Sequence, residues 1–437
     1  MPAIKQILAS ITILANTFTH CSLQSPLTST RLPREIQLII AQYATEHLRD
    51  IVQQIDAHTK SINSLTTSLD GKYAVSSSSD SKTRLWALKP AIICKTLLAN
   101  FRNWTSTEPA SNGFYIPHVS ALSPDGNYIA TPTEDQLSIN FWARSTFGLS
   151  ISQLYSFDFN QKINDIAISP CSTYIALAHT SGATGTYTGG RREHYGFSLC
   201  PLNANSPLRF LPAICASTVR YSPTGNHIAV GTSQGIYLIT ITHEQTENRT
   251  TSYFDIELLP ESSGISEMQL AFSPCGGYLY AASTLSMHSD KLIPSEKTEE
   301  TDGGALHYTY RDRKKFGKLD IYSVHTKKIV QTLPEDRIVH ALALSPDGKY
   351  MAIGSEPAHQ DFWVHGTFDM NAKKKNIVTE PKKYQNALKI WDITLQEFVQ
   401  TFDLNGSVTA LAFSQNNLLV GLNNGHILLL KIKENNI

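Results

Sequence analysis

The stretch that decides the fold is Ala121-Leu-Ser-Pro-Asp-Gly-Asn-Tyr-Ile-Ala130, which joins an apolar run, a serine, a tight turn and a second apolar run. Proline fixes one backbone torsion angle and Gly126 can adopt a positive φ, so Pro-Asp-Gly favours a turn. The flanking runs are short, β-branched or aromatic, and bounded by turn residues. The stretch therefore predicts two strands joined by a hairpin.

The same phrase recurs along the 437-residue chain. Further copies begin at Leu65, Ile166, Val219, Leu270 and Leu342, and the last copy, at Leu411, has lost its proline and glycine. One serine anchors each of the seven copies: Ser68, Ser123, Ser169, Ser222, Ser273, Ser345 and Ser414. Because a recurring phrase is the signature of a repeat architecture, the anchors predict seven structural units.

In the strand before each serine, large and small apolar residues follow one another, as in Leu270, Ala271 and Phe272. A strand that is apolar at every position is buried on both faces. Alternate large and small side chains suit the tapering space near the axis of a propeller. We therefore expect an all-β, seven-bladed β-propeller in which this strand is the innermost of each blade.

The two ends of the chain are expected to meet in one blade. Outer strands should precede each new blade, and residues 328–333 and 397–402 have the expected pattern. Residues 50–55 match them but precede the first blade. We predict that this N-terminal outer strand completes blade 7 beside residues 425–431, since closure of the ring removes exposed sheet edges.

Three blades end on a tryptophan, in Arg84-Leu-Trp-Ala87, Asn140-Phe-Trp-Ala143 and Leu388-Lys-Ile-Trp-Asp392. With these segments the units resemble WD (WD40) repeats, and the resemblance extends over residues 49–437. The resemblance implies a non-catalytic scaffold, and a buried network of His, Ser, Asp and Trp that ties the strands of a blade. Only blade 1 has the full set. The structural network positions are His58, Ser76 or Ser78, Asp80, Trp86, Trp142, Trp391 and Asp392.

A short helix is expected at residues 31–48, before the propeller, because proline lies in its first turn and apolar residues follow at helical spacing. It resembles the first helix of an F-box, the module that docks a Skp1-like adaptor. The candidate adaptor-binding residues are Leu32, Pro33, Ile36, Ile39, Ile40 and Tyr43. The alternative is an amphipathic helix packed under the propeller.

Composition sets the partner class and the compartment. Lys plus Arg and Asp plus Glu both number 37, so no net charge draws the chain onto nucleic acid or a membrane. Six scattered cysteines without a Cys-x-x-Cys pair argue against a disulfide framework and a zinc site. We expect a cytoplasmic monomer that binds other proteins and uses no cofactor. Residues 1–30 form a leader, and secretion is the alternative if residues 1–25 are a signal peptide.

Long insertions are expected on one face of the propeller, at residues 181–195, 285–317 and 356–385, beside the entry loop 100–117. Consecutive strands of a blade are antiparallel, so these connections share a side. Cations beside aromatic residues suit an acidic protein, a phosphate or single-stranded nucleic acid, and a solvated loop is the alternative. The candidate partner-binding residues are Arg311, Arg313, Lys314, Lys315, Phe362, Trp363, Phe368, Lys373, Lys374 and Lys375.

An enzyme is the third interpretation, after a scaffold and an F-box-like substrate receptor of a ubiquitin-ligase-type complex. Seven aligned residues should line the channel mouth, and none is acidic: Asn63, His118, Asn164, Ser217, Met268, His340 and Thr409. Asp165 and Glu267 are the carboxylates adjacent to them. A catalytic site needs an acid–base constellation, which this ring does not supply. We therefore expect no catalytic, metal-binding or cofactor-binding residues.

Overall fold

The computed structural model describes residues 51–88, 93–97, 119–132, 138–144, 151–158, 162–179, 195–202, 208–212, 214–246, 249–262, 268–288, 293–294, 309–334, 337–357, 360–365, 388–415 and 417–432. Residues 54–429 form one compact unit. The other unit, residues 1–53 and 430–437, is described only at the ends of two strands. The expected leader, the F-box-like helix and the entry loop lie outside the described residues.

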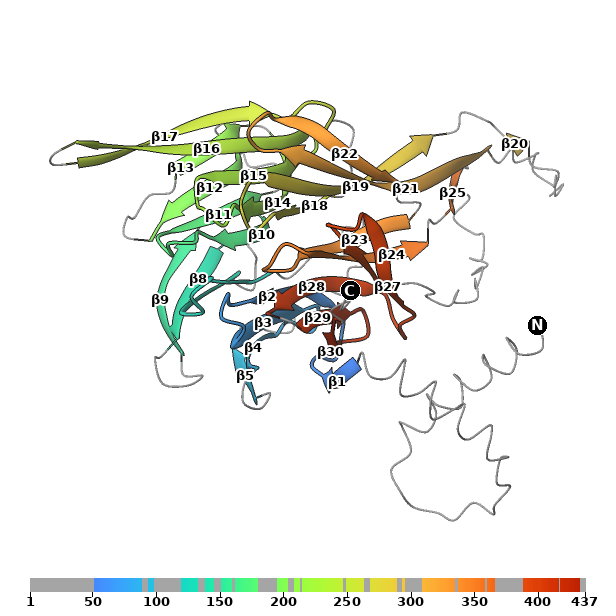
Figure 1. Cartoon of the computed structure of the whole chain (residues 1–437), viewed down its shortest axis with the longest axis horizontal. Helices are drawn as coiled ribbons and strands as arrows, with labels where there is room; N and C mark the ends of the chain where they lie inside the picture. Colours follow the sequence, from blue (N-terminus) through green and yellow to red (C-terminus); the bar gives the residue numbers. More distant parts are fainter. Residues whose placement is uncertain are drawn as a thin grey trace, which may run out of the picture. The chain divides into compact units, whose positions relative to one another are not determined.

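The described residues fold into seven antiparallel sheets (Figure 1). Blade 1 is β2 (Ile62–Thr67), β3 (Tyr73–Ser78), β4 (Thr83–Ala87) and β5 (Ile93–Leu97). Blade 2 is β6 (Ala121–Leu122), β7 (Tyr128–Pro132), β8 (Ser138–Arg144) and β9 (Ile151–Asp158). Blade 3 is β10 (Ile163–Ile168), β11 (Tyr174–His179), β12 (Tyr195–Pro201) and β13 (Leu208–Pro212). Blade 4 is β14 (Ala216–Tyr221), β15 (His227–Thr232), β16 (Gly235–Thr246) and β17 (Arg249–Leu258).

The last three blades follow the same order, with additions in blade 5. Blade 5 is β18 (Met268–Phe272), β19 (Tyr278–His288), β21 (Thr309–Ser323) and β22 (Lys328–Pro334). The strands β20 (Ile293–Pro294) and β25 (Gln360–His365) also pair with β21. Blade 6 is β23 (Arg337–Leu344), β24 (Tyr350–Pro357), β26 (Leu388–Asp392) and β27 (Glu397–Phe402). Blade 7 is β28 (Val408–Ser414), β29 (Asn417–Leu422), β30 (His426–Lys431) and β1 (Ile51–Asp56).

The innermost strands form a closed ring. Each of β2, β6, β10, β14, β18, β23 and β28 contacts the innermost strand of the next blade, and β28 contacts β2. The strand before each anchoring serine is therefore the innermost one, and the predicted seven-bladed propeller is confirmed. The predicted closure is also confirmed, because β1 is the outer strand of blade 7 beside β30.

The anchoring serines cap the hairpins that the repeated phrase predicts. In six blades the hydroxyl oxygen accepts a hydrogen bond from the N–H five residues later, as between Ser123 and Tyr128 at 2.8 Å. Gly126 has the predicted positive φ, at 72°. In blade 7, where the phrase is degenerate, Ser414 donates instead to the carbonyl of Gly71 in blade 1, at 3.0 Å. That serine therefore ties the last blade to the first.

The hydrophobic core lies between neighbouring blades. Ala121 of blade 2 belongs to the same buried cluster as Ile166 and Ile168 of blade 3. Likewise Ala412 of blade 7 shares a cluster with Leu65 of blade 1. Small residues of one innermost strand thus pack with large residues of the next, since close packing leaves no room for two large ones. Packing between blades is therefore one reason for the alternation of large and small residues.

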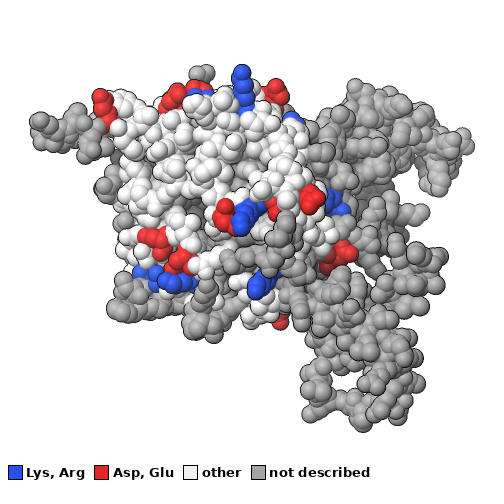
Figure 2. Space-filling model, viewed as in Figure 1, with Lys and Arg blue, Asp and Glu red and all other residues white. Residues whose placement is uncertain are grey.

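Charged side chains are scattered over the surface. In the view of Figure 2 the basic and acidic side chains of the described residues are interspersed, with no broad area of one sign. No helix among the described residues is long and apolar enough to cross a membrane.

Candidate interaction site

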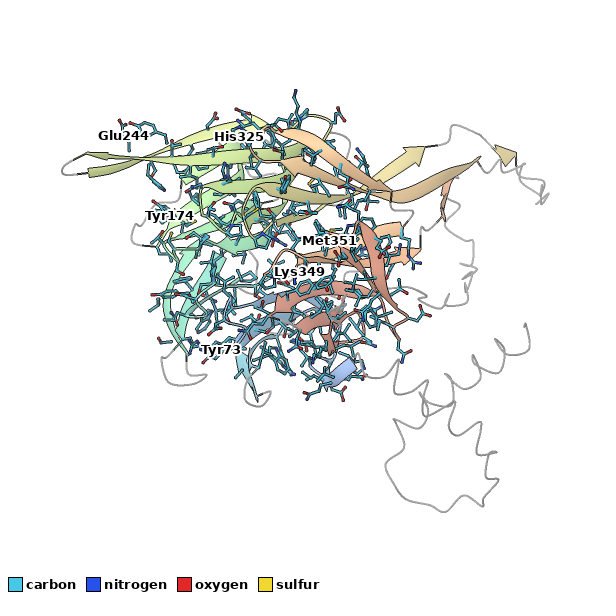
Figure 3. All side chains as sticks on the ribbon, in the orientation of Figure 1. Tyr73, Tyr174, Glu244, His325, Lys349 and Met351 are labelled. Carbon is cyan, nitrogen blue, oxygen red and sulfur yellow. The ribbon has the colours of Figure 1, made fainter. Side chains whose placement is uncertain are left out.

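Four side chains of blade 1 form one hydrogen-bonded network. One of them, Ser76, lies on β3, the strand that begins at Tyr73, which Figure 3 labels. The indole N–H of Trp86 donates to Ser76 Oγ at 2.9 Å, and His58 Nε2 lies 2.8 Å from the same oxygen. His58 Nδ1 lies 3.0 Å from Asp80 Oδ2. Ser78 stands outside the network, donating to the carbonyl of Lys60 and accepting from the N–H of Asp80.

The protonation states of the network follow from burial and charge. Burial lowers the pKa of His58, against the opposing effect of Asp80. Burial alone would raise the pKa of Asp80, but His58 and the N–H groups of Thr59 and Lys82 outweigh it and lower the pKa. A neutral His58 can donate from Nδ1 to an ionised Asp80 and accept from the Ser76 hydroxyl at Nε2. Trp86 then donates to Ser76, Ser76 to His58 and His58 to Asp80, so each donor in the network has an acceptor.

The two other tryptophans make local contacts only. The indole N–H of Trp142 donates to Thr131 Oγ1 at 3.0 Å within blade 2. Trp391 meets the ring of Phe398 edge-on, with ring centroids 4.8 Å apart. Asp392 is buried and accepts from the N–H groups of Thr394 and Leu395, which caps the turn after β26. The structure thus brings the four side chains of blade 1 together and leaves these three residues in separate blades.

A channel of about 440 Å³ lies among the innermost strands. Five of the seven aligned mouth residues line it: Asn63, Asn164, Ser217, Met268 and Thr409. His340 lies 3.3 Å from Glu356, and the described part of the channel lining does not include it. His118 and Glu267 lie outside the described residues.

Asp165 is the one carboxylate among the described residues that line the channel. Its oxygens accept from the N–H groups of Ile166 and Val219, at 2.9 and 3.0 Å, and from the Thr218 hydroxyl at 2.8 Å. The Arg220 guanidinium also bonds to it. Oδ2 accepts three of these bonds and Oδ1 accepts one, and the three to Oδ2 bind blade 3 to blade 4. Within the described residues, no group of three or more His, Cys, Asp or Glu is placed to hold a metal ion.

The structure pairs two of the long insertions with each other. The outer half of β21, in blade 5, pairs antiparallel with β25, which follows β24 of blade 6. Arg311 is opposite Trp363, Arg313 is opposite Asp361 and Lys314 is opposite Gln360. Phe368, Lys373, Lys374 and Lys375 lie outside the described residues, as do the candidate adaptor-binding residues. Sequence reasoning did not anticipate this pairing, because strands from different blades leave no local signal of their register.

The Asp165–Arg220 pair did leave a signal in the sequence. Arg220 stands two residues before its anchor, Ser222, where five of the other blades have alanine. A long cation at a position that packing otherwise keeps small requires a partner. That exception in the repeat could have identified the ion pair.

The comparisons with known proteins agree with this geometry. The family described as WD domain, G-beta repeat matches residues 49–87, which span β1 to β4. No curated protein matches the chain. The solved β-propeller domain of Cps50 (Swd1) from Myceliophteria thermophila is similar, with a TM-score of 0.52 and 12% identity, over 88% of this chain and 99% of that chain. At that identity the likeness concerns the fold alone. The chain is therefore a seven-bladed β-propeller, and residues 49–87 of it match the WD-repeat family.

Proposed function

We propose that this protein is a non-catalytic WD-repeat scaffold that mediates protein–protein interaction through one loop-rich face. The pairing of β21 with β25 carries this proposal, because it joins insertions of two neighbouring blades into a single projection. Binding residues concentrate on loops that a rigid scaffold positions. The closed ring is such a scaffold, and most of the candidate partner-binding residues belong to these two insertions.

The channel supports a binding role over a catalytic one. General acid–base chemistry requires a carboxylate, a histidine or a similar group that is free to exchange a proton with a substrate. Asp165 already accepts from the backbone, a hydroxyl and a guanidinium. The channel carboxylate therefore acts as a link between blades.

Affinity capture from the native host, followed by mass spectrometry, tests the proposal. The baits are the full chain and two variants with a glycine–serine segment of equal length. One replaces residues 360–365 of β25, and the matched control replaces residues 246–251 at the tip of the β16–β17 hairpin. We expect the full chain and the control to enrich the same proteins, and the β25 variant to lose them. Equal enrichment by all three baits would contradict the loop-rich face, and no enrichment by any would contradict the scaffold.

A second candidate is an F-box-like substrate receptor, which the helical spacing of Ile36, Ile39, Ile40 and Tyr43 favours. Pull-down of a Skp1-like adaptor with the full chain, and with a chain lacking residues 1–48, decides between the two. Adaptor bound only by the full chain supports the receptor. For either function we propose a cytoplasmic protein, monomeric by itself. Cys171, Cys200, Cys215 and Cys275 are free thiols.

A further inference from the structure

Arg220 is the only Lys or Arg among the described residues that line the channel, and part of its guanidinium group is unused. The side chain is 38% exposed. Both of its hydrogen bonds come from Nη1, one to Asp165 Oδ2 and one to the carbonyl of Val219 at 2.6 Å. Nε and Nη2 donate to no group within the described part of the chain. These two atoms form the other edge of the planar group, and such an edge binds a carboxylate through two parallel hydrogen bonds.

Asp165 holds the guanidinium of Arg220 in place. Its Oδ2 atom also accepts from the Thr218 hydroxyl and the Val219 N–H, on the strand that carries Arg220. The carboxylate is therefore anchored independently, and the free edge of Arg220 is oriented before a ligand arrives, which lowers the entropy cost of binding. Asp165 also offsets part of the charge of Arg220. That favours an anion with one negative charge over a phosphate dianion.

Small side chains of neighbouring blades leave space at the level of Arg220. Thr66, Ala121 and Ala167 occupy the same position of the repeat, two residues before their anchoring serines, and all three line the channel. A long side chain in one blade therefore faces short ones in three others. The cavity, of about 440 Å³, has room beside the guanidinium for a ligand.

Past the level of Arg220, the described lining comes from blades 1 to 4 and is apolar except for Ser222 and the Tyr221 hydroxyl. We call it the apolar wall, and it comprises Leu69, Leu122, Pro124, Ile168, Pro170, Tyr221 and Pro223. Leu69 is 71% exposed, at a position where five other blades have proline. One cation and an apolar wall thus line the same cavity.

We propose that the channel binds a small organic monocarboxylate with an apolar body. The carboxylate binds the free edge of Arg220, and the body packs against the apolar wall. The cavity volume is in the range of sites for small ligands, about 300–1,000 Å³. Two sources can supply this chemistry, a free organic acid or the C-terminal residue of a protein with an apolar side chain. None of the described lining residues belongs to β21 or β25, so this inference is independent of the proposed scaffold function.

Isothermal titration calorimetry of the full chain tests the ligand chemistry with matched probes. Phenylbutyrate has both the carboxylate and the apolar body, whereas phenylbutanol lacks the charge and acetate lacks the body. We expect phenylbutyrate to bind at least about tenfold more tightly than either control, because bidentate, charge-assisted hydrogen bonds add to apolar contact. The tripeptide Ala-Ala-Phe with a free C-terminus, compared with its C-terminal amide, represents the second source. If the free tripeptide binds more tightly than phenylbutyrate and its amide does not bind, the site takes a chain terminus.

Two substitutions and a control locate the site. Arg220→Gln should raise the Kd of phenylbutyrate about tenfold, because it removes the charged edge. Arg144→Gln is the control, since Arg144 also donates to a backbone carbonyl, that of Gly126, but does not line the channel. Its Kd should stay within about twofold of the parent value. Leu69→Ser should raise the Kd about threefold, because it removes apolar contact and leaves the cation intact.

Thermal denaturation shows whether each variant is folded. Leu69→Ser changes an exposed turn residue, so it remains informative if Arg220→Gln does not fold, as does the comparison of phenylbutyrate with phenylbutanol on the parent chain. Equal affinity of the parent for those two probes would overturn the inference. So would unchanged binding by a folded Arg220→Gln, an equal loss in Arg144→Gln, or no binding of both phenylbutyrate and the free tripeptide.

Discussion

Replacing Ser76 with alanine removes a single hydroxyl group, but it should destabilise blade 1 more than the loss of one atom suggests. The side chain is fully buried on β3. Its oxygen accepts from Trp86 at 2.9 Å and lies 2.8 Å from Nε2 of a neutral His58, to which it donates. Alanine fits the site without strain, so the backbone is unchanged. The substitution therefore isolates the loss of one hydroxyl between two buried partners.

The expected cost follows from the two groups left behind. A buried donor or acceptor without a partner costs about 1–3 kcal/mol, so Ser76→Ala should lower the free energy of unfolding by about 2–4 kcal/mol. Trp86→Ala should cost about 3–5 kcal/mol, as emptying a buried aromatic site does. His58→Ala should cost about 1–3 kcal/mol, because it leaves Ser76 and Asp80 without their shared partner.

Ser198 is the matched control. It is also fully buried, on β12, but its hydroxyl oxygen has no hydrogen-bond partner within the described part of the chain. Ser198→Ala removes an unsatisfied group instead of creating two, so stability should stay within about 0.5 kcal/mol or increase. Urea unfolding measures both variants, and hydrogen exchange of peptides that cover β3 and β4 localises the effect. Equal stability of Ser76→Ala and Ser198→Ala would refute the network as a source of stability.

Three other perturbations test the closure, the channel and the response to pH. Gly425→Ala should lower the melting temperature sharply, because a Cβ there would lie 2.1 Å from the carbonyl oxygen of His58. Deletion of residues 1–57 should expose the edge of β30 and cause aggregation that light scattering detects, whereas deletion of residues 1–30 should not. Asp165→Asn should cost about 1–3 kcal/mol in urea unfolding, since it leaves Arg220 without its carboxylate, and it should leave partner capture unchanged. The pKa values of His58 and Asp80 are lowered in the folded chain, so folding favours the deprotonated form of each group. The free energy of unfolding should therefore fall as the pH drops below about 6.5, and again below about 4. In urea denaturation, the free energy of unfolding of His58→Gln should differ less between pH 7.5 and pH 5.5 than that of the parent.

The repeated phrase was sufficient to predict the ring because each of its parts acts locally. A serine hydroxyl caps the N–H five residues later, and a glycine permits the turn between them. These interactions are the same in nearly every blade, so the same hairpin interpretation applies to each copy of the phrase along the chain. The closure by β1 was predictable for a related reason, since an outer strand before blade 1 had no partner except blade 7.

The pairing of β21 with β25 could not be predicted in this way. Pairing of β21 with β25 joins residues about 50 positions apart across two blades, and nothing in either strand encodes the register. The grouping of all four cations as one candidate site was therefore as far as composition and spacing could lead.

The ring uses many of its own polar side chains internally. Ser123 and its counterparts cap hairpins, His58 completes a network that ends at Asp80, and Asp165 joins two blades. Each of these groups is held by partners within the fold, so a ligand would have to break existing hydrogen bonds to reach it. The outer half of β21 pairs instead with β25, an interaction that the closed ring of innermost strands does not require.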